Sequence, residues 1–138
     1  MSYAALKKKI ITVNGGSQIR PNIHVEDLTN LYIFLLNKGK KINGIYNAGF
    51  ENLSVLNIAK KIQKIIPCKI NILKKNFDPR SYRLDSSKLL SIGFTPKYKI
   101  SDAVYELKKA FDNNQLIDNP RFHSIAWLKK LAKLGKIK

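Results

Sequence analysis

One polar junction holds the residue types best suited to chemistry: GGSQIRPNIHVEDL, at residues 15–28. Arg20 can pair with two oxygens of a phosphate at once through its forked guanidinium, and Pro21 stiffens the backbone that presents it. Only four of the chain's 26 basic residues are arginines, so an arginine at this place is a specific choice. Alternatively, Arg20 pairs with Glu26 or Asp27 and merely ties the junction to the helix that follows.

A second polar stretch, KKNFDPRSYRLD at residues 74–85, offers groups suited to a ligand that carries hydroxyls and a ring. Asp78 could accept a hydrogen bond from a hydroxyl, and Tyr82 could stack or hydrogen-bond. In the other interpretation, Asp78, Arg80 and Arg83 form only a surface ion network. The single cysteine, Cys68, lies in an apolar neighbourhood and is expected to be a small buried hydrophobe. His123 has no cysteine or acidic cluster near it, and we expect no metal site.

The elements that must position these residues alternate between short strands and helices, which predicts an α/β fold with a partly parallel sheet. Strands are expected over residues 9–13, 44–49 and 69–73. Helices are expected from Val25 or Glu26 to about residue 38, from the N-cap Ser54 to Pro67, over 86–90 and from the N-cap Ser101. Asn47, Asn52 and Ser54 are expected to be structural turn and cap residues. Three or four strands are few for a complete doubly wound domain.

The chain divides into residues 1–113, which hold all these elements, and a basic helical tail over residues 114–138. The apolar residues of the tail lie opposite lysines at helical spacing: Ile125, Leu128, Leu131, Ala132 and Leu134. A C-terminal helix that packs its apolar stripe on the body is the favoured interpretation. A helix that lies on a membrane surface is the alternative.

The formal net charge of +17 raises the question of nucleic-acid binding. Lysines supply most of that charge, and the sequence has no helix-turn-helix signature, no Cys/His finger and no interleaving of aromatic with basic residues. A basic nucleic-acid-binding module is therefore kept only as an alternative. The longest apolar run, residues 31–36, is far shorter than the roughly 20 residues of a membrane span. The N-terminus does not resemble a signal peptide, so a cytoplasmic location is expected.

Four blocks together carry a family resemblance: ITVNGGSQIRPNIHVEDL, GIYNAGFENLSVLNIAKKI, DPRSYRLDSSKLLSIGFTP and ISDAVYELKKAF. Their order and spacing, over about residues 10–111, resemble the C-terminal part of extended short-chain dehydrogenases/reductases, the NAD-dependent nucleotide-sugar epimerases and dehydratases. In that family an N-terminal Rossmann half binds NAD and carries a Tyr-x-x-x-Lys catalytic pair, and the C-terminal part supplies the sugar-nucleotide pocket. The resemblance implies a partial fold without a complete Rossmann domain.

The resemblance also assigns candidate site residues. It implies that Gln18 and Arg20 line the pocket for a nucleotide diphosphate sugar, with Arg20 reaching the diphosphate. Related enzymes commonly place an arginine near the position of Lys75, so Lys75 would supply a point charge there and Arg80 would take over the paired contact. Asp78 and Tyr82 complete the implied set. His24, at the start of a helix, is expected to be a structural hydrogen-bonding residue.

The family's catalytic and cofactor motifs are not found at their proper places. The sequence has no G-x-G-x-x-G, and Gly15-Gly16 leads into SQIRPN instead of a helix. Tyr-x-x-x-Lys occurs at Tyr3/Lys7 and Tyr105/Lys109, but with this many tyrosines and lysines about one such spacing arises by chance, and neither pair stands where the family has it. We therefore expect no catalytic residue and no cofactor bound by this chain alone.

The expected function is that of a truncated or split sugar-nucleotide-binding portion of such an enzyme, inactive by itself, in the synthesis of polysaccharide or glycoconjugate precursors. The complete enzyme would use NAD(P), and 4-epimerisation, dehydration, decarboxylation and reduction all stay open as its reaction. The expected partner is a separate chain with the Rossmann half, or a second copy in a homodimer. A non-functional gene fragment is the remaining alternative.

Overall fold

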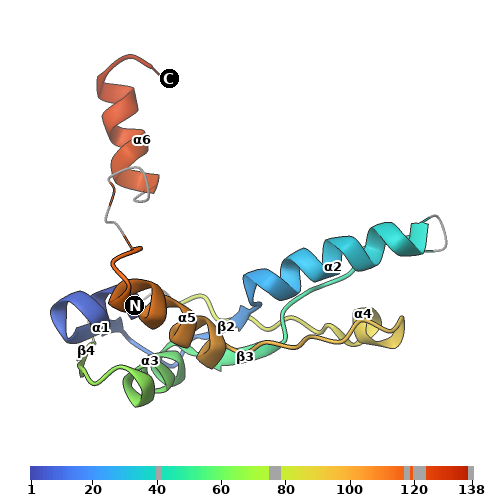
Figure 1. The fold of residues 1–138 in the computed structure, drawn as a ribbon, viewed down its shortest axis with the longest axis horizontal. Helices are drawn as coiled ribbons and strands as arrows, with labels where there is room; N and C mark the ends of the chain where they lie inside the picture. Colours follow the sequence, from blue (N-terminus) through green and yellow to red (C-terminus); the bar gives the residue numbers. More distant parts are fainter. Residues whose placement is uncertain (40–41, 75–78, 117–118, 120–123, 137–138) are drawn as a thin grey trace.

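The computed structural model describes residues 1–39, 42–74, 79–116, 119 and 124–136 (Figure 1). Lys75, Asp78, Arg121 and His123 lie outside the described residues. The elements in chain order are α1 (Ser2–Lys8), β1 (Ile10–Asn14), β2 (Ile19–Asn22), α2 (Val25–Lys38), β3 (Glu51–Ser54), α3 (Val55–Ile65), β4 (Lys69–Leu73), α4 (Ser87–Ser91), α5 (Ile100–Asp112) and α6 (Ser124–Lys133).

The described strands form two small sheets. β1 and β4 pair in parallel, with Ile10 opposite Lys69 and Asn14 opposite Leu73. β2 and β3 pair antiparallel, with Ile19 opposite Ser54 and Asn22 opposite Glu51. Parallel pairing needs a crossover, and α3 leads directly into β4. The expected α/β fold with a partly parallel sheet and few short strands is confirmed.

The larger hydrophobic core lies between the parallel strands and three helices. β1 alternates, so Ile11 and Val13 are buried while Thr12 is exposed. α3 carries its apolar residues on one face, which buries Ala59 and Ile62, and its N-cap is Ser54 as expected. The remaining members of the core come from α1, α5 and the end of α3: Ala5, Leu6, Ile66 and Val104. Cys68 packs against this core. Burial raises the pKa of its thiol above the ordinary value, and the nearby charge of Lys9 offsets only part of that rise.

A second, smaller core joins α2 to α4 on the other side of the chain, where the two helices extend away from the sheets (Figure 1). Leu31, Leu89 and Phe94 are its buried members. Phe94 meets Phe34 edge-on with ring centroids 5.5 Å apart and stacks on Phe50 at 5.8 Å. Such aromatic pairs add about 0.5–1.5 kcal/mol each beyond the area that they bury.

The expected strand over residues 44–49 is wrong, and the strand that pairs with β2 is β3. The polar groups of 44–49 bond to side chains of a later segment instead of a neighbouring strand. Ser86 Oγ accepts from Gly49 N and donates to its carbonyl, and Lys88 Nζ donates to the Ile45 carbonyl. The expected cap of α5 is also wrong, because Lys99 precedes the helix and its N–H donates to the Asp102 carboxylate.

The expectation that the C-terminal helix packs on the body is wrong as well. No residue of α6 is buried, and α6 stands apart from the other elements in Figure 1. Its apolar residues Ile125, Leu128 and Leu134 are 72%, 51% and 57% exposed. Among the described residues, no helix has the length and apolar character needed to cross a membrane.

Candidate functional site

The glycine turn after β1 closes the N-terminus of α3. The first four N–H groups of a helix have no partner within it, and at α3 three of them find one: Val55 N donates to the Gln18 carbonyl, Leu56 N to the Gly16 carbonyl and Asn57 N to Ser54 Oγ. Gly16 has φ +112°, and a Cβ there would lie 3.1 Å from Leu56 Cβ. The turn therefore serves to seat a helix against the sheet.

This turn does not fit a dinucleotide. A phosphate-binding glycine loop offers free backbone N–H groups and opens a helix. Gly15 N instead donates to the Leu73 carbonyl at 2.8 Å, and Gly16 N donates to Gln18 Oε1 at 2.7 Å. The next element is β2, and the helix that the turn does touch is already capped. We therefore derive no cofactor contact from Gly15 and Gly16.

The segment of residues 79–85 runs beside the small antiparallel sheet and is fixed there by side chains. Ser81 Oγ accepts from Ile19 N at 2.9 Å, and Tyr82 N donates to the Ile19 carbonyl. The side-chain amide of Asn52 makes two hydrogen bonds with the backbone of Leu84. Its oxygen accepts from the Leu84 N–H and its nitrogen donates to the Leu84 carbonyl, each at 3.0 Å. Asn52 was expected to be structural, which is confirmed. The tie made by Ser81 has no signal in the sequence.

This arrangement brings together three of the predicted site residues. Arg20, on β2, donates from Nη1 to the carbonyl of Arg80, and its guanidinium carbon lies 5.2 Å from the centroid of the Tyr82 ring. The same nitrogen donates to the Ile19 carbonyl at 2.9 Å. Tyr82 is 53% exposed and Arg80 is exposed as well. The Arg20 guanidinium thus lies between an aromatic ring and the backbone of Arg80, in a segment 60 residues away in sequence.

Gln18 lies inside the turn and not on this surface. It is 7% exposed, and both ends of its amide are engaged, since Nε2 donates to the Asn14 carbonyl at 2.7 Å and Oε1 accepts from Gly16 N. Lys75 and Asp78 fall outside the described residues. Of the predicted set, the structure therefore gathers Arg20, Arg80 and Tyr82.

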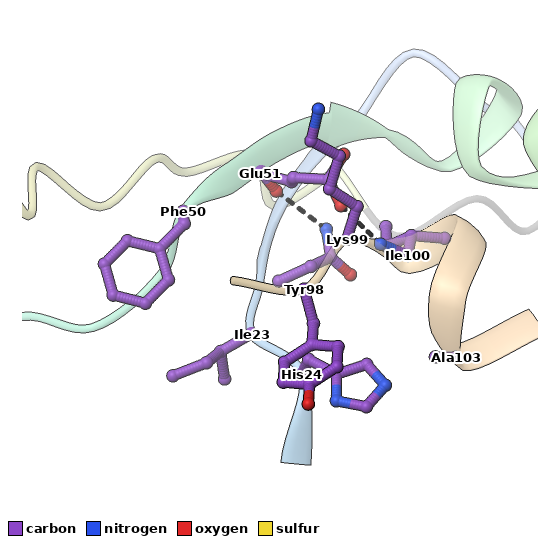
Figure 2. A pocket seen from close by; sticks show the side chains of 9 residues that line it. Ile23, His24, Phe50, Glu51, Tyr98, Lys99, Ile100 and Ala103 are labelled. Atoms are coloured by element: carbon purple, nitrogen blue, oxygen red, sulfur yellow. Dashed lines mark hydrogen bonds between the residues drawn. The ribbon is translucent and has the colours of Figure 1, made fainter. Parts of the chain in front are cut away.

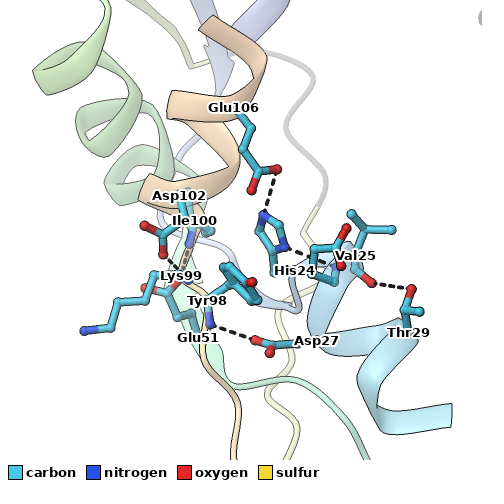
Figure 3. Close-up of polar contacts among 11 residues, drawn as sticks. His24, Val25, Asp27, Thr29, Glu51, Tyr98, Lys99, Ile100, Asp102 and Glu106 are labelled. Carbon is cyan, nitrogen blue, oxygen red and sulfur yellow. Dashed lines mark hydrogen bonds and ion pairs between the residues drawn. The ribbon is translucent and has the colours of Figure 1, made fainter. Parts of the chain in front are cut away.

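Asp27 does not ion-pair across the junction; it holds a distant segment in place. It is 1% exposed, and its two carboxylate oxygens accept hydrogen bonds from Lys97 N at 2.9 Å and Tyr98 N at 3.0 Å. Figure 3 shows the bond from Tyr98. Asp27 also stands in the first turn of α2, where the helix dipole favours an acid. This clamp joins the start of α2 to the segment that enters α5.

His24 is the N-cap of α2, which confirms its expected structural role. Its Nδ1 accepts from Glu26 N at 3.2 Å, so in this arrangement the ring hydrogen is on Nε2. Nε2 lies 3.4 Å from Glu106 Oε2 on α5 without forming an aligned hydrogen bond. The ring stacks on Tyr98, with centroids 4.8 Å apart. Because Nδ1 is already an acceptor, neither ring nitrogen presents a free lone pair to a metal.

A cavity of about 210 Å³ opens beside His24, between β3 and the start of α5 (Figure 2). The polar residues that line it are Asn22, His24, Glu51, Tyr98 and Lys99. The cavity is smaller than the roughly 300–1,000 Å³ of most ligand sites. The Glu51 carboxylate already has two partners in the protein: it accepts a hydrogen bond from Ile100 N and pairs with Lys61 Nζ at 3.5 Å. None of the predicted residues that the structure describes lines this cavity, and we take it as part of the junction between β3 and α5.

Comparison with known proteins places this geometry in context. Models of known protein families give no match. The chain is 25% identical over 101 residues to GDP-L-fucose synthase 1 of Arabidopsis thaliana, covering 70% of this chain and 31% of that protein. It is 22% identical over 110 residues to a probable GDP-L-fucose synthase 1 of Oryza sativa subsp. japonica, covering 77% of this chain and 33% of that protein. The chain thus spans about a third of the length of these curated relatives.

Two solved structures share the fold. L-threonine dehydrogenase from Phytophthora infestans superimposes with a TM-score of 0.65 at 20% identity, over 80% of this chain and 40% of that one. ADP-L-glycero-D-manno-heptose-6-epimerase from Helicobacter pylori gives a TM-score of 0.61 at 19% identity, over 76% of this chain and 34% of that one. This chain has part of the extended short-chain dehydrogenase/reductase fold. Its α/β portion resembles part of the fold of these epimerase/dehydratase-like enzymes and is consistent with the C-terminal part of that fold.

The two Tyr-x-x-x-Lys pairs of this chain lie on the helices α1 and α5. Lys7 Nζ donates to the Tyr3 hydroxyl at 3.3 Å on α1, and the Tyr3 ring meets Phe111 of α5 edge-on at 6.4 Å. Tyr105 is 59% exposed on α5. That these two spacings arise by chance stays a prediction.

Proposed function

We propose that this chain binds a nucleotide diphosphate sugar as the substrate-binding portion of an NAD-dependent epimerase or dehydratase. The observation that carries the proposal is that the Arg20 guanidinium lies over the Tyr82 ring beside β2 and donates to the backbone carbonyl of Arg80. Guanidinium groups pair with phosphate oxygens in a fork, and an aromatic ring offers a stacking face to a base or sugar. The names of the relatives and neighbours, GDP-L-fucose synthase and an ADP-heptose epimerase, support a nucleotide diphosphate sugar as the ligand class.

The contacts of Arg20 favour the binding of an anion. Arg20 is oriented by its contacts to two carbonyls and to the Tyr82 ring, so little side-chain freedom is left to lose when an anion binds. Lys75 and Asp78 extend the same polar stretch, and their contribution to the pocket stays a prediction. Gln18 supports the site from within the turn.

The chemistry itself requires a partner that supplies the nicotinamide site, since the glycine turn of this chain does not fit a dinucleotide. The expected partner surface is one side of α2, where Val25, Tyr32 and Leu36 are 65%, 64% and 79% exposed at helical spacing. Apolar exposure of this extent along one helix marks an interaction site. We propose that an NAD-binding half, in the same polypeptide or a separate chain, covers it. A cytoplasmic location and a role in glycoconjugate precursor synthesis stay predictions.

Chemical-shift mapping tests the binding site directly. A ¹⁵N-labelled chain is titrated with GDP-, UDP- and ADP-sugars in parallel with inorganic phosphate. The proposal predicts saturable shifts for at least one nucleotide sugar, centred on residues 19–22 and 79–84, with much weaker effects of phosphate. Shifts spread over the lysine-bearing face of α3, equal for phosphate and nucleotide sugar, would instead report non-specific anion binding.

A further inference from the structure

The C-terminal helix α6 combines an exposed apolar side with a purely basic polar side. Its ten residues, SIAWLKKLAK, contain three lysines and no acid. At about 100° per residue, Lys129, Lys130 and Lys133 fall on one side of the helix. The other side carries the apolar residues, of which Ile125 and Leu128 are 72% and 51% exposed. Leu134, which follows the helix, is 57% exposed and continues that side.

The exposed apolar side of α2 has a different electrostatic character. α2 opens with Glu26 and Asp27 and carries a single lysine, Lys38, at its end. An acidic helix end is repelled by an anionic surface, so the apolar side of α2 suits a protein partner. α6 has lysines and no acid, so its charge is complementary to an anionic surface. Its exposed apolar side requires that this surface also have an apolar layer beneath the charged one.

We propose that α6 docks on an anionic membrane surface. The helix lies in the plane of the interface, with Ile125, Leu128 and Leu131 at the boundary between headgroups and acyl chains and the lysines among lipid phosphates. Trp127 borders the apolar side, and tryptophan favours this depth of a bilayer. Its ring lies 5.6 Å from Lys130 Nζ, which places the indole between the two sides.

Both the apolar side and the basic side of α6 make contacts in this arrangement. A nucleic acid would engage the lysines and leave the apolar side in water, whereas a lipid surface takes both. A helix of ten residues is about 15 Å long, so the attachment is reversible. The net charge of +17 adds long-range attraction toward the same surface. This inference does not depend on the proposed sugar-nucleotide site.

The sole tryptophan of the chain makes the test specific to α6. The full chain is mixed with vesicles of phosphatidylcholine alone, or with added phosphatidylglycerol, and binding is followed by co-sedimentation and by Trp127 emission. We expect sedimentation, a blue shift and quenching by brominated lipid only with the anionic vesicles. Equal binding to both vesicle types, no binding, or sedimentation without quenching of Trp127 would overturn the proposal.

Matched variants separate α6 from the general charge. Replacing Lys129, Lys130 and Lys133 by glutamine removes three charges at little cost in helix propensity. At roughly a fivefold effect per lysine, the partition coefficient falls on the order of a hundredfold. The control replaces Lys60, Lys64 and Lys69 on α3 and β4, with the same loss of charge, and changes partitioning much less. Equal effects of both triple variants would contradict the proposal.

A third variant tests the apolar side. Leu128→Gln combined with Leu131→Gln leaves the charge intact and abolishes quenching by brominated lipid. Soluble polyglutamate serves as the lipid-free control. If polyglutamate alone produces the blue shift and vesicles do not, α6 binds an acidic protein surface and the membrane proposal is wrong.

Discussion

The guanidinium of Arg20 lies over the ring of Tyr82, with 5.2 Å between its central carbon and the ring centroid. The two residues are far apart in sequence, and hydrogen bonds from Ile19 to Ser81 and from Arg20 to the Arg80 carbonyl hold their segments together. A cation above an aromatic face contributes about 0.5–1 kcal/mol at an exposed site. The larger consequence is positional, because the charged fork and the ring are presented together.

Replacing Arg20 by lysine is expected to weaken binding of a nucleotide diphosphate sugar about tenfold. Lysine keeps the charge but loses the forked pairing with phosphate, and hydrogen bonds to charged groups are worth about 1.5–3 kcal/mol. The measurement is calorimetric titration of both proteins. Arg83→Lys is the matched control in the neighbouring segment and should leave the affinity within about twofold. If both variants weaken binding equally, Arg20 has no special role.

Gly49→Ala is expected to destabilise the fold by about 1–3 kcal/mol. Gly49 is buried, and a Cβ at that position would lie 2.9 Å from Pro21 Cβ and 3.1 Å from Leu84 Cδ1. Pro21 follows Arg20, and Leu84 belongs to the segment of Tyr82, so the affinity for nucleotide sugar should fall as well. Urea unfolding measures the first effect. An unchanged urea midpoint would mean that Pro21 and Leu84 can shift to make room for the added methyl group without loss of stability.

Asp27→Asn is expected to cost about 1–3 kcal/mol of stability. The asparagine amide nitrogen cannot accept, so one of the backbone N–H groups of Lys97 and Tyr98 would lose its partner in a buried place. Asp112→Asn is the control, since Asp112 pairs only with Lys108 on the exposed side of α5 and such pairs contribute about 0.3–0.5 kcal/mol. Comparable losses in the two variants would argue against the clamp.

The pH dependence of the start of α4 is expected to come from Asp85. Its carboxylate accepts from the hydroxyl of Ser87 at 2.6 Å and from the backbone N–H of Ser87 at 2.9 Å, and these bonds lower the pKa of Asp85 below its ordinary value. Because the pKa of Asp85 is lower in the folded than in the unfolded protein, its ionised carboxylate stabilises the fold at pH values above the unfolded-state pKa. This contribution is lost as the pH falls through the folded-state pKa. Ser87→Ala should raise the pKa of Asp85 toward its ordinary value in an NMR titration. Identical titration curves would show that the hydroxyl has no influence.

Local signals were enough to predict the parallel strands and every described helix except α1, which was missed. α3 has a side-chain cap at Ser54, an apolar stripe and Pro67 beyond its end, and all of these act within a few residues. β2 was missed because it is four residues long and contains Pro21, which weakens a strand signal. The strand expected over 44–49 failed because Ser86 and Lys88, some 40 residues later, take its polar groups.

The sequence predicts which residues belong to the candidate site but not how they are arranged. Arg20, Arg80 and Tyr82 were selected by residue type and family resemblance, whereas their convergence depends on the contacts of Ser81 and Asn52 with backbone groups far away in sequence. The burial of Gln18 depends on the left-handed turn at Gly15 and Gly16, which pulls its amide inward. For α6, periodicity predicted the helix, but periodicity does not specify what lies against its apolar side.

The most direct test of the central claim is calorimetric titration of the protein, purified as its native host makes it, with GDP-, UDP- and ADP-sugars at physiological salt. Nucleoside monophosphates and a mixed-sequence RNA serve as competitors. We predict stoichiometric binding of at least one nucleotide diphosphate sugar that RNA does not displace and that Arg20→Lys weakens about tenfold. Binding of RNA in preference to every nucleotide sugar, or no binding of any nucleotide sugar, would contradict the account.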